Sequence, residues 1–114
     1  MDWLLSGIVV VLLVVGYLIF RSRADVSGSE ARQLVDAGAV LLDVRTPQEF
    51  SGGHIEGAIN IPVQELHHRL ADVGAHDRAV VVYCRSGMRS ARASAMLKEA
   101  GFSAVRDLGG IGRW

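Results

Sequence analysis

The sequence predicts a small α/β domain with a mainly parallel sheet, preceded by one apolar N-terminal helix. Short runs rich in valine and leucine alternate along the chain with helix-start signals. Such alternation is typical of a parallel sheet covered by helices. An uncharged run near the N-terminus predicts the separate helix. The chain has 114 residues, which leaves room for a single compact core beside that helix.

The uncharged run covers residues 3–20 (WLLSGIVVVLLVVGYLIF). A helix over these residues is about 27 Å long, which is enough to cross a thin hydrocarbon core. No basic residue precedes the run and no A-x-A site follows it, so the pattern favours a membrane anchor over a cleaved signal peptide. A buried soluble helix is disfavoured because such a helix usually keeps a polar face.

The residues that flank this run predict its orientation. Arg21 and Arg23 lie just after it, and no Lys or Arg lies before it. The positive-inside rule therefore predicts a single-pass anchor over residues 1–23 in the inner (cytoplasmic) membrane, with residues 24–114 as a domain facing the cytoplasm. The run has no G-x-x-x-G pattern, so it gives no reason to expect helix dimers, and we expect a monomer.

Helix-start signals and apolar runs divide the domain into elements. Residues 27–30 (SGSE) and 46–49 (TPQE) have the spacing of a capping box, which predicts that a helix begins at each. The first of these helices is expected to end at Gly38. Further helices are expected over residues 63–70 and 90–100. The apolar runs that predict strands cover residues 40–44, 58–61, 79–83 and 104–108.

Charge and cysteine content exclude several classes of function. The chain has 12 basic and 12 acidic residues, so it lacks the basic excess that nucleic-acid binding requires. Its one Cys and four His show no zinc-ligand spacing, so a zinc site built on Cys is excluded. A single Cys cannot form an intramolecular disulfide, and an unpaired thiol fits a reducing compartment such as the cytoplasm.

Cys84 directly follows the strand predicted over residues 79–83, and a helix is expected a few residues later. Sites in parallel α/β sheets form beyond the carboxyl ends of the strands. Backbone N–H groups in a turn, a helix N-terminus and nearby arginines all favour a thiolate over a thiol. Because a cysteine that only packs in a core needs no such neighbours, the pattern indicates a reactive cysteine.

The residues after Cys84 suit the binding of an anion. Arg85 and Arg89 supply positive charge close to the sulfur. Gly87 can take a positive φ and so allows a tight turn. The hydroxyls of Ser86 and Ser90 can donate hydrogen bonds to an anion.

Four motifs occur in a fixed order along the domain. They are DVR at 43–45, GGHIEGAINIP at 52–62, CRSGMR at 84–89 and GGIGRW at 109–114. With these motifs, the sequence resembles a single-domain rhodanese over nearly all of residues 25–114. The resemblance implies a rhodanese-like three-layer α/β fold around a mainly parallel five-strand sheet.

The resemblance also implies a thiosulfate or persulfide sulfurtransferase that needs no metal or organic cofactor. Cys84 is then expected to accept a sulfane sulfur and to pass it to a small acceptor, such as cyanide or a thiol, or to a protein acceptor. The residues implied to bind the persulfide and the substrate anion are Arg85, Ser86, Gly87, Met88 and Arg89.

Several polar residues allow two interpretations. Asp43 and Arg45 follow a strand, so they are expected at the same edge of the sheet as Cys84, either to orient the active loop or as a structural ion pair. His54 either assists substrate entry or stabilises its own loop. Glu49 and Asp107 are interpreted as cap and loop residues.

Two other functions stay open at this point. One is a membrane-docked binding or scaffold module that keeps the fold with little turnover. The other is a thiol-based phosphatase or arsenate reductase. Enzymes of this kind have a loop that resembles residues 84–89, but they need the larger C-x5-R spacing to hold a tetrahedral oxyanion. The spacing from Cys84 to Arg89 is C-x4-R, and Ser90 stands at the next place. The shorter loop favours a single sulfur atom.

Overall fold

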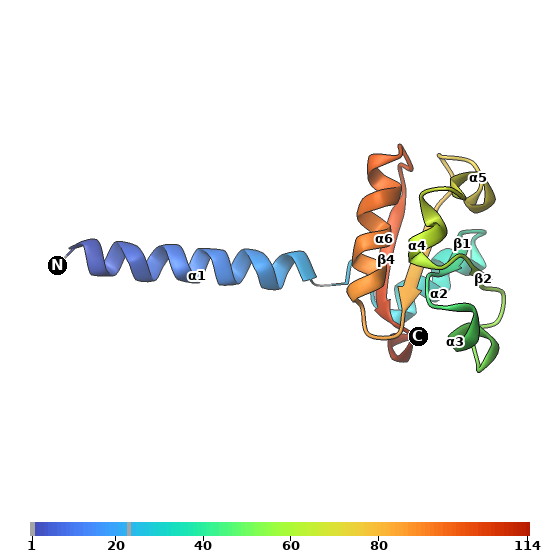
Figure 1. Cartoon of the computed structure of the whole chain (residues 1–114), viewed down its shortest axis with the longest axis horizontal. Helices are drawn as coiled ribbons and strands as arrows, with labels where there is room; N and C mark the ends of the chain where they lie inside the picture. Colours follow the sequence, from blue (N-terminus) through green and yellow to red (C-terminus); the bar gives the residue numbers. More distant parts are fainter. Residues whose placement is uncertain (1, 23) are drawn as a thin grey trace.

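The structure is a computed structural model that describes residues 2–22 and 24–114. A long N-terminal helix precedes a domain in which helices and strands alternate (Figure 1). The elements follow the chain in the order α1 (Asp2–Ser22), α2 (Gly28–Asp36), β1 (Val40–Asp43), α3 (Pro47–Ser51), β2 (Ile59–Asn60), α4 (Val63–Leu66), α5 (Leu70–Val73), β3 (Val80–Cys84), α6 (Met88–Glu99), β4 (Val105–Gly110) and the 3-10 helix η1 (Ile111–Arg113).

The strands form one parallel sheet in the order β2-β1-β3-β4. The expectation of five strands was wrong, because the described part of the chain contains a sheet of four. Residues 24–26 lie at the outer edge of β4, where Asp25 N and Val26 N both donate to Asp107 O, at 2.8 and 3.3 Å. The chain enters the cap of α2 at Ser27, so this contact is too short to form a strand.

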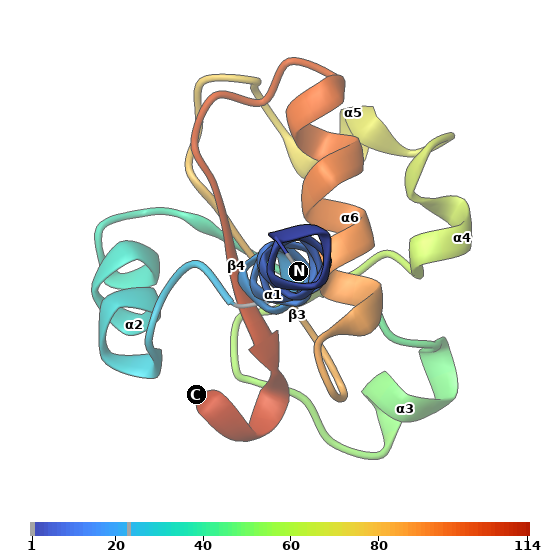
Figure 2. The same ribbon diagram turned by 90° about the vertical axis from the view of Figure 1, so that its left-hand side faces the viewer.

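Helices cover both faces of the sheet, which gives the predicted three layers. Figure 2 shows α6 with α4 and α5 on one side, and α2 with η1 on the other. Along β3, Val80, Val82 and Cys84 belong to the apolar cluster under α4, α5 and α6. Val81 and Tyr83 belong to the cluster under α2. Such a strand, buried on both faces, is typical of a parallel sheet.

Both predicted capping boxes are confirmed. Ser27 Oγ accepts a hydrogen bond from Glu30 N at 3.1 Å, and Glu30 Oε1 accepts one from Ser27 N. Thr46 and Glu49 make the same reciprocal pair at the start of α3, where Pro47 occupies the first turn. These side chains satisfy N–H groups that have no partner within the helix.

The helix predicted over residues 63–70 is divided into α4 and α5. The backbone at Arg69 has φ −127° and ψ 27°, which is outside the helical region. The turn between the two helices is closed by tighter bonds, from His68 N to Glu65 O and from Arg69 N to Leu66 O. Helix α6 also begins two residues earlier than predicted, at Met88.

Helix α1 confirms the predicted N-terminal helix. Its large apolar side chains from Trp3 to Tyr17 are exposed, and Figure 1 shows it projecting away from the domain. Within residues 2–22 and 24–114, no helix meets the combined requirements of length and apolarity for crossing a bilayer. The predicted membrane span is therefore not confirmed.

Candidate active site

The carboxyl ends of three neighbouring strands bring the sequence motifs together. Asp43 ends β1, Cys84 ends β3, and Gly110 ends β4. Cys84 pairs with Gly110 across the β3–β4 contact, and Asp43 pairs with Tyr83 across the β1–β3 contact. Three motifs that are far apart in sequence thus meet at one edge of the sheet, as expected for a site in a parallel α/β fold.

The Cys84 sulfur lies at the start of a helix. Gly87 N donates to Cys84 Sγ at 3.0 Å, and α6 begins at the next residue. Gly87 has φ 109°, a left-handed conformation that favours glycine. The turn therefore aims a backbone N–H and a helix N-terminus at the sulfur, and both stabilise negative charge there.

The sulfur itself is buried. Cys84 is only 1% exposed, whereas the loop residues Arg85, Ser86 and Met88 are exposed. Met88 is 84% exposed and lies at the surface beside the loop. A small molecule approaching the sulfur thus meets these exposed loop residues first.

Ser90 has a different role from the one predicted. Its Oγ donates to Gly87 O at 3.0 Å and lies 3.4 Å from Gly109 O. The side chain is buried. Its hydroxyl joins the loop at residues 85–89, which we call the sulfur loop, to the end of β4 and does not point at an incoming anion. The sequence offered no signal for this contact, because it joins residues 19 positions apart.

The backbone of Gly110 packs closely against the sulfur loop. A Cβ at this position would lie 2.8 Å from Arg85 O and 3.4 Å from Ser86 Cα. Both of these are backbone atoms, which cannot swing away as the end of a side chain can. The missing side chain at Gly110 therefore sets where the loop runs.

Substitution of Gly110 by alanine is expected to push the loop away from β4. We expect sulfur loading on Cys84 to slow by about tenfold or more, since small displacements of a positioned group have large effects, and the domain to lose about 1–3 kcal/mol of stability. Gly112→Ala is the matched control, because no atom lies within 4 Å of its added Cβ. Stopped-flow loading rates measure the effect, and equal rates in the two variants would contradict it.

Arg89 is held by a carboxylate from another helix. Its Nη1 lies 2.6 Å from Glu49 Oε1, and its Nη2 lies 2.9 Å from Glu49 Oε2. The hydrogen bonds from Arg89, together with the N–H of Thr46, lower the pKa of Glu49 to about 2. The hydrogen bond to Glu49 also raises the pKa of Arg89. The capping interpretation of Glu49 was thus correct but incomplete.

The lowered pKa of Glu49 predicts a stability that depends on pH. The carboxylate contributes stability fully above its ordinary pKa of 4.5, and this contribution is lost as the pH falls through about 2. We expect on the order of 2 kcal/mol from this group. Urea unfolding of the wild type and of Glu49→Gln over this range measures it. A difference in stability that stays constant down to the lowest pH would count against the assignment.

Asp43 and Arg45 form a buried ion pair. Arg45 Nη2 lies 2.7 Å from Asp43 Oδ2 and also donates to Gly53 O at 2.8 Å. The Arg45 guanidinium lies 5.7 Å from the centre of the Tyr83 ring. Tyr83 Oη accepts a hydrogen bond from Ile55 N at 3.1 Å, and burial raises the pKa of Tyr83 to about 12. These contacts join the end of β1 to the loop at 53–55.

His54 stabilises its own loop. Its ring stacks on Phe50 with the ring centres 3.6 Å apart and an interplanar angle of 6°. His54 Nδ1 lies 2.8 Å from Phe50 O. Both contacts fix the turn after α3, which agrees with the second of the two interpretations given for this residue.

Asp107 supports the end of β4. Its Oδ1 accepts a hydrogen bond from Gly109 N at 2.8 Å, next to the glycine pair that faces the loop. Burial raises the pKa of Asp107.

In residues 2–22 and 24–114, no group of three or more His, Cys, Asp or Glu side chains is arranged to hold a metal ion.

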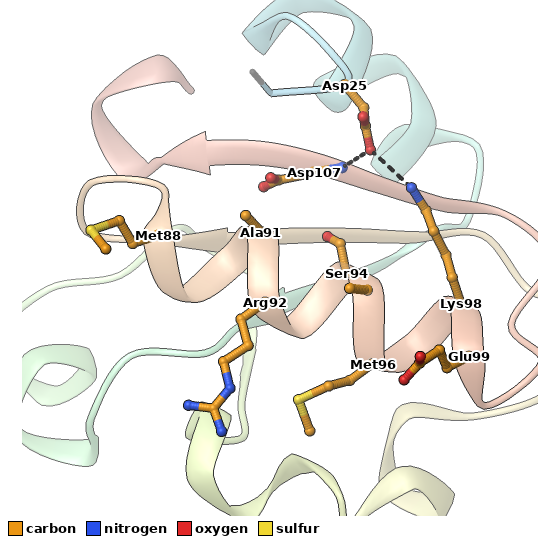
Figure 3. A pocket seen from close by; sticks show the side chains of 10 residues that line it. Asp25, Met88, Ala91, Arg92, Ser94, Met96, Lys98, Glu99 and Asp107 are labelled. Carbon is orange, nitrogen blue, oxygen red and sulfur yellow. Dashed lines mark hydrogen bonds and ion pairs between the residues drawn. The ribbon is translucent and has the colours of Figure 1, made fainter. Parts of the chain in front are cut away.

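A groove of about 520 Å³ runs along α6. Figure 3 shows Asp25 at its upper rim, between Asp107 and Lys98. Asp25 Oδ2 accepts a hydrogen bond from Asp107 N at 3.1 Å and lies 3.6 Å from Lys98 Nζ. Cys84 does not line this groove. The polar contacts of Asp25 at the rim of the groove instead hold the segment at 24–26 against β4 and α6.

Comparison with known families decides the relationship. A family model described as the rhodanese-like domain matches residues 27–114. This chain belongs to the rhodanese-like family. The match includes the sulfur loop, the Asp43–Arg45 pair and the glycine pair at the end of β4. The match thus begins at the cap of α2 and contains the sulfur loop and the residues that support it.

Individual relatives agree with this assignment. A sulfurtransferase of Allochromatium vinosum is 42% identical over 90 residues, covering 77% of this chain and 83% of that protein. The uncharacterised protein YqhL of Bacillus subtilis is 43% identical over 77 residues, and the match spans only 60% of its length. The human single-domain sulfurtransferase TSTD1 superimposes with a TM-score of 0.70 at 30% identity, covering 81% of this chain and 92% of that one. Membership of the rhodanese family supports a sulfurtransferase activity for this chain.

Proposed function

We propose that this chain is a membrane-attached sulfurtransferase. It moves a sulfane sulfur from thiosulfate or a persulfide donor to a thiophilic acceptor through a persulfide on Cys84. The observation that carries the proposal is the bond from Gly87 N–H to Cys84 Sγ at the N-terminus of α6. This arrangement favours a sulfur anion at the end of β3, which both halves of the reaction require.

In the first half-reaction, the Cys84 thiolate attacks the outer sulfur of the donor. A new S–S bond forms to Cys84 Sγ, the S–S bond of the donor breaks, and sulfite or a thiol leaves with the electron pair. The exposed guanidinium of Arg85 attracts the donor anion, and the backbone N–H groups of the loop stabilise the charge as it moves.

In the second half-reaction, cyanide, a thiol or a protein thiolate attacks the outer sulfur of the Cys84 persulfide. The product leaves with that sulfur, and the Cys84 thiolate is restored. The two halves form a ping-pong cycle with a covalent intermediate. The cycle calls for no metal and no organic cofactor, because each half-reaction forms one bond to the transferred sulfur and breaks one S–S bond, with no net oxidation or reduction.

Intact-protein mass spectrometry of the full chain in detergent tests the chemistry. After incubation with thiosulfate, we expect the added mass of one sulfur atom, which cyanide then removes. A folded protein that gains no sulfur from thiosulfate or from an alkyl persulfide would overturn the proposal. Gain of sulfur without release to cyanide or a thiol would instead favour a binding or scaffold role.

The attachment to a membrane is supported by α1. The exposed apolar side chains from Trp3 to Tyr17 lose contact with water if they enter lipid, which is favourable in proportion to their area. Arg21 and Arg23 follow the apolar run, which favours a domain facing the cytoplasm. We expect a monomer, with the bilayer as the partner of α1.

Fractionation of cells tests this attachment. The chain is expected in the membrane fraction after an alkaline wash and in the soluble fraction only after detergent is added. Protease added to spheroplasts is expected to leave the domain intact, since it faces the cytoplasm. Release by the alkaline wash alone would overturn the attachment, and digestion of the domain would overturn the orientation.

A further inference from the structure

The sulfur loop carries two arginines, but their charges are not equally available to a donor. Arg89 makes two short contacts with the Glu49 carboxylate, at 2.6 and 2.9 Å. Arg85 is exposed, and among the residues that the structure describes no ion pair includes it. An incoming anion therefore meets one unopposed positive charge rather than two.

The pair between Glu49 and Arg89 is fixed in place. Thr46 N donates to Glu49 Oε1 at 3.1 Å, and Glu49 N donates to Thr46 Oγ1 at 3.1 Å. The Glu49 side chain is 23% exposed and that of Arg89 is 30% exposed, so both are partly buried. A two-point contact with a carboxylate that is itself held by the α3 cap leaves the guanidinium little freedom to turn to a substrate.

This pair lies near the sulfur, because Arg89 is in the first turn of α6, two residues after the Gly87 N–H that donates to Cys84 Sγ. Besides the bond to Glu49, the charge on Cys84 contributes to the raised pKa of Arg89. The neighbouring Asp43–Arg45 pair adds no net charge, because its two members lie 2.7 Å apart and cancel each other. Glu49 thus reduces by one the positive charge that acts on an anion at the loop.

The two classes of donor respond differently to that reduction. Thiosulfate carries two negative charges, whereas a persulfide R–S–S⁻ with a neutral R group carries one. Coulomb energy is proportional to the product of the charges, so loss of one positive charge weakens the binding of the dianion twice as much. Compared with a site that has two unopposed cations, a site with one therefore shifts the preference toward the singly charged donor.

We propose that Glu49 determines donor specificity, biasing the Cys84 site toward singly charged persulfides and against thiosulfate. This inference rests on the proposed sulfurtransferase function. The favoured step consumes the Cys84 thiolate, R–S–S⁻ and one proton, and it yields the Cys84 persulfide anion and R–SH. One S–S bond forms and one breaks, so no external oxidant or reductant is needed.

The test compares kcat/KM for thiosulfate and for an alkyl persulfide with a neutral R group, using the full chain in detergent. Glu49→Gln keeps an acceptor for the N–H of Thr46 but removes the negative charge. We expect the ratio of kcat/KM for thiosulfate to that for the persulfide to rise about tenfold in this variant. Asp36→Asn is the matched control, because it changes charge equally at the last residue of α2, and it is expected to leave the ratio unchanged.

A second variant keeps the proposal testable if Glu49→Gln does not fold. Arg85→Gln removes the unopposed charge from an exposed residue and is expected to lower the same ratio about tenfold. A ratio that stays constant in either variant, with both donors affected equally, would overturn the role of Glu49 and leave it as a structural partner of Arg89. A wild type that takes sulfur from neither donor would instead overturn the proposed function itself.

Discussion

Replacement of Cys84 by serine is expected to lower thiocyanate formation from thiosulfate and cyanide by about 10³-fold or more. The reason is that the proposed cycle passes through a bond between sulfur and Cys84 Sγ, which a serine hydroxyl cannot replace as nucleophile and leaving group. A serine still fits the site, because it is smaller than cysteine and its hydroxyl oxygen can accept the hydrogen bond from Gly87 N. The fold is therefore expected to survive.

The measurement combines a colorimetric thiocyanate assay with urea unfolding of both proteins. Similar unfolding curves would show that loss of turnover is not loss of fold. Turnover by Cys84→Ser at more than a tenth of the wild-type rate would contradict a covalent relay at this residue. The single cysteine in the sequence makes the result unambiguous, because no second thiol can substitute.

Replacement of Asp43 by alanine is expected to destabilise the domain by about 3–5 kcal/mol. This change leaves the guanidinium of Arg45, which is 6% exposed, without its carboxylate partner. The remaining contact, from Arg45 to the carbonyl of Gly53, does not neutralise the charge. For a domain of this size, we expect the melting temperature to fall by roughly 15 °C or more.

A double variant separates the buried charge from the loss of packing. Asp43→Leu combined with Arg45→Met removes both charges and keeps apolar volume, so it is expected to be clearly more stable than Asp43→Ala. Thermal unfolding of the three proteins, followed by circular dichroism, gives the comparison. If the double variant is no more stable than the single one, the cost lies in packing or in the Gly53 contact rather than in an unpaired charge.

Local signals in the sequence predicted most of the fold. The capping boxes at Ser27 and Thr46 could be predicted because each joins a side-chain hydroxyl to a backbone N–H three residues away. The strands were readable because buried parallel strands are nearly continuous apolar runs. The position of Cys84 at a strand end followed from the same pattern, which is why the reactive residue could be predicted without a structure.

Contacts between distant residues could not be predicted in this way. The Glu49–Arg89 pair joins residues 40 positions apart. The capping box at Thr46 already accounts for a glutamate at position 49, so nothing in the sequence indicated a second partner. The break at Arg69 depends on a backbone angle rather than on a helix-breaking residue. The missing fifth strand also depends on distant contacts, because the N–H groups of Asp25 and Val26 both donate to the carbonyl of Asp107, which is not the pattern of a paired strand.

The burial of Cys84 also governs how long the thiol survives in the presence of oxidants. Oxidation of a cysteine to sulfenic and then sulfinic acid depends on access to the sulfur, and Cys84 is 1% exposed. The chain has no second cysteine, so a sulfenic acid at this site cannot be trapped as an internal disulfide and then reduced. The low exposure of the sulfur thus slows its oxidation but does not reverse it, and any repair depends on thiols from outside.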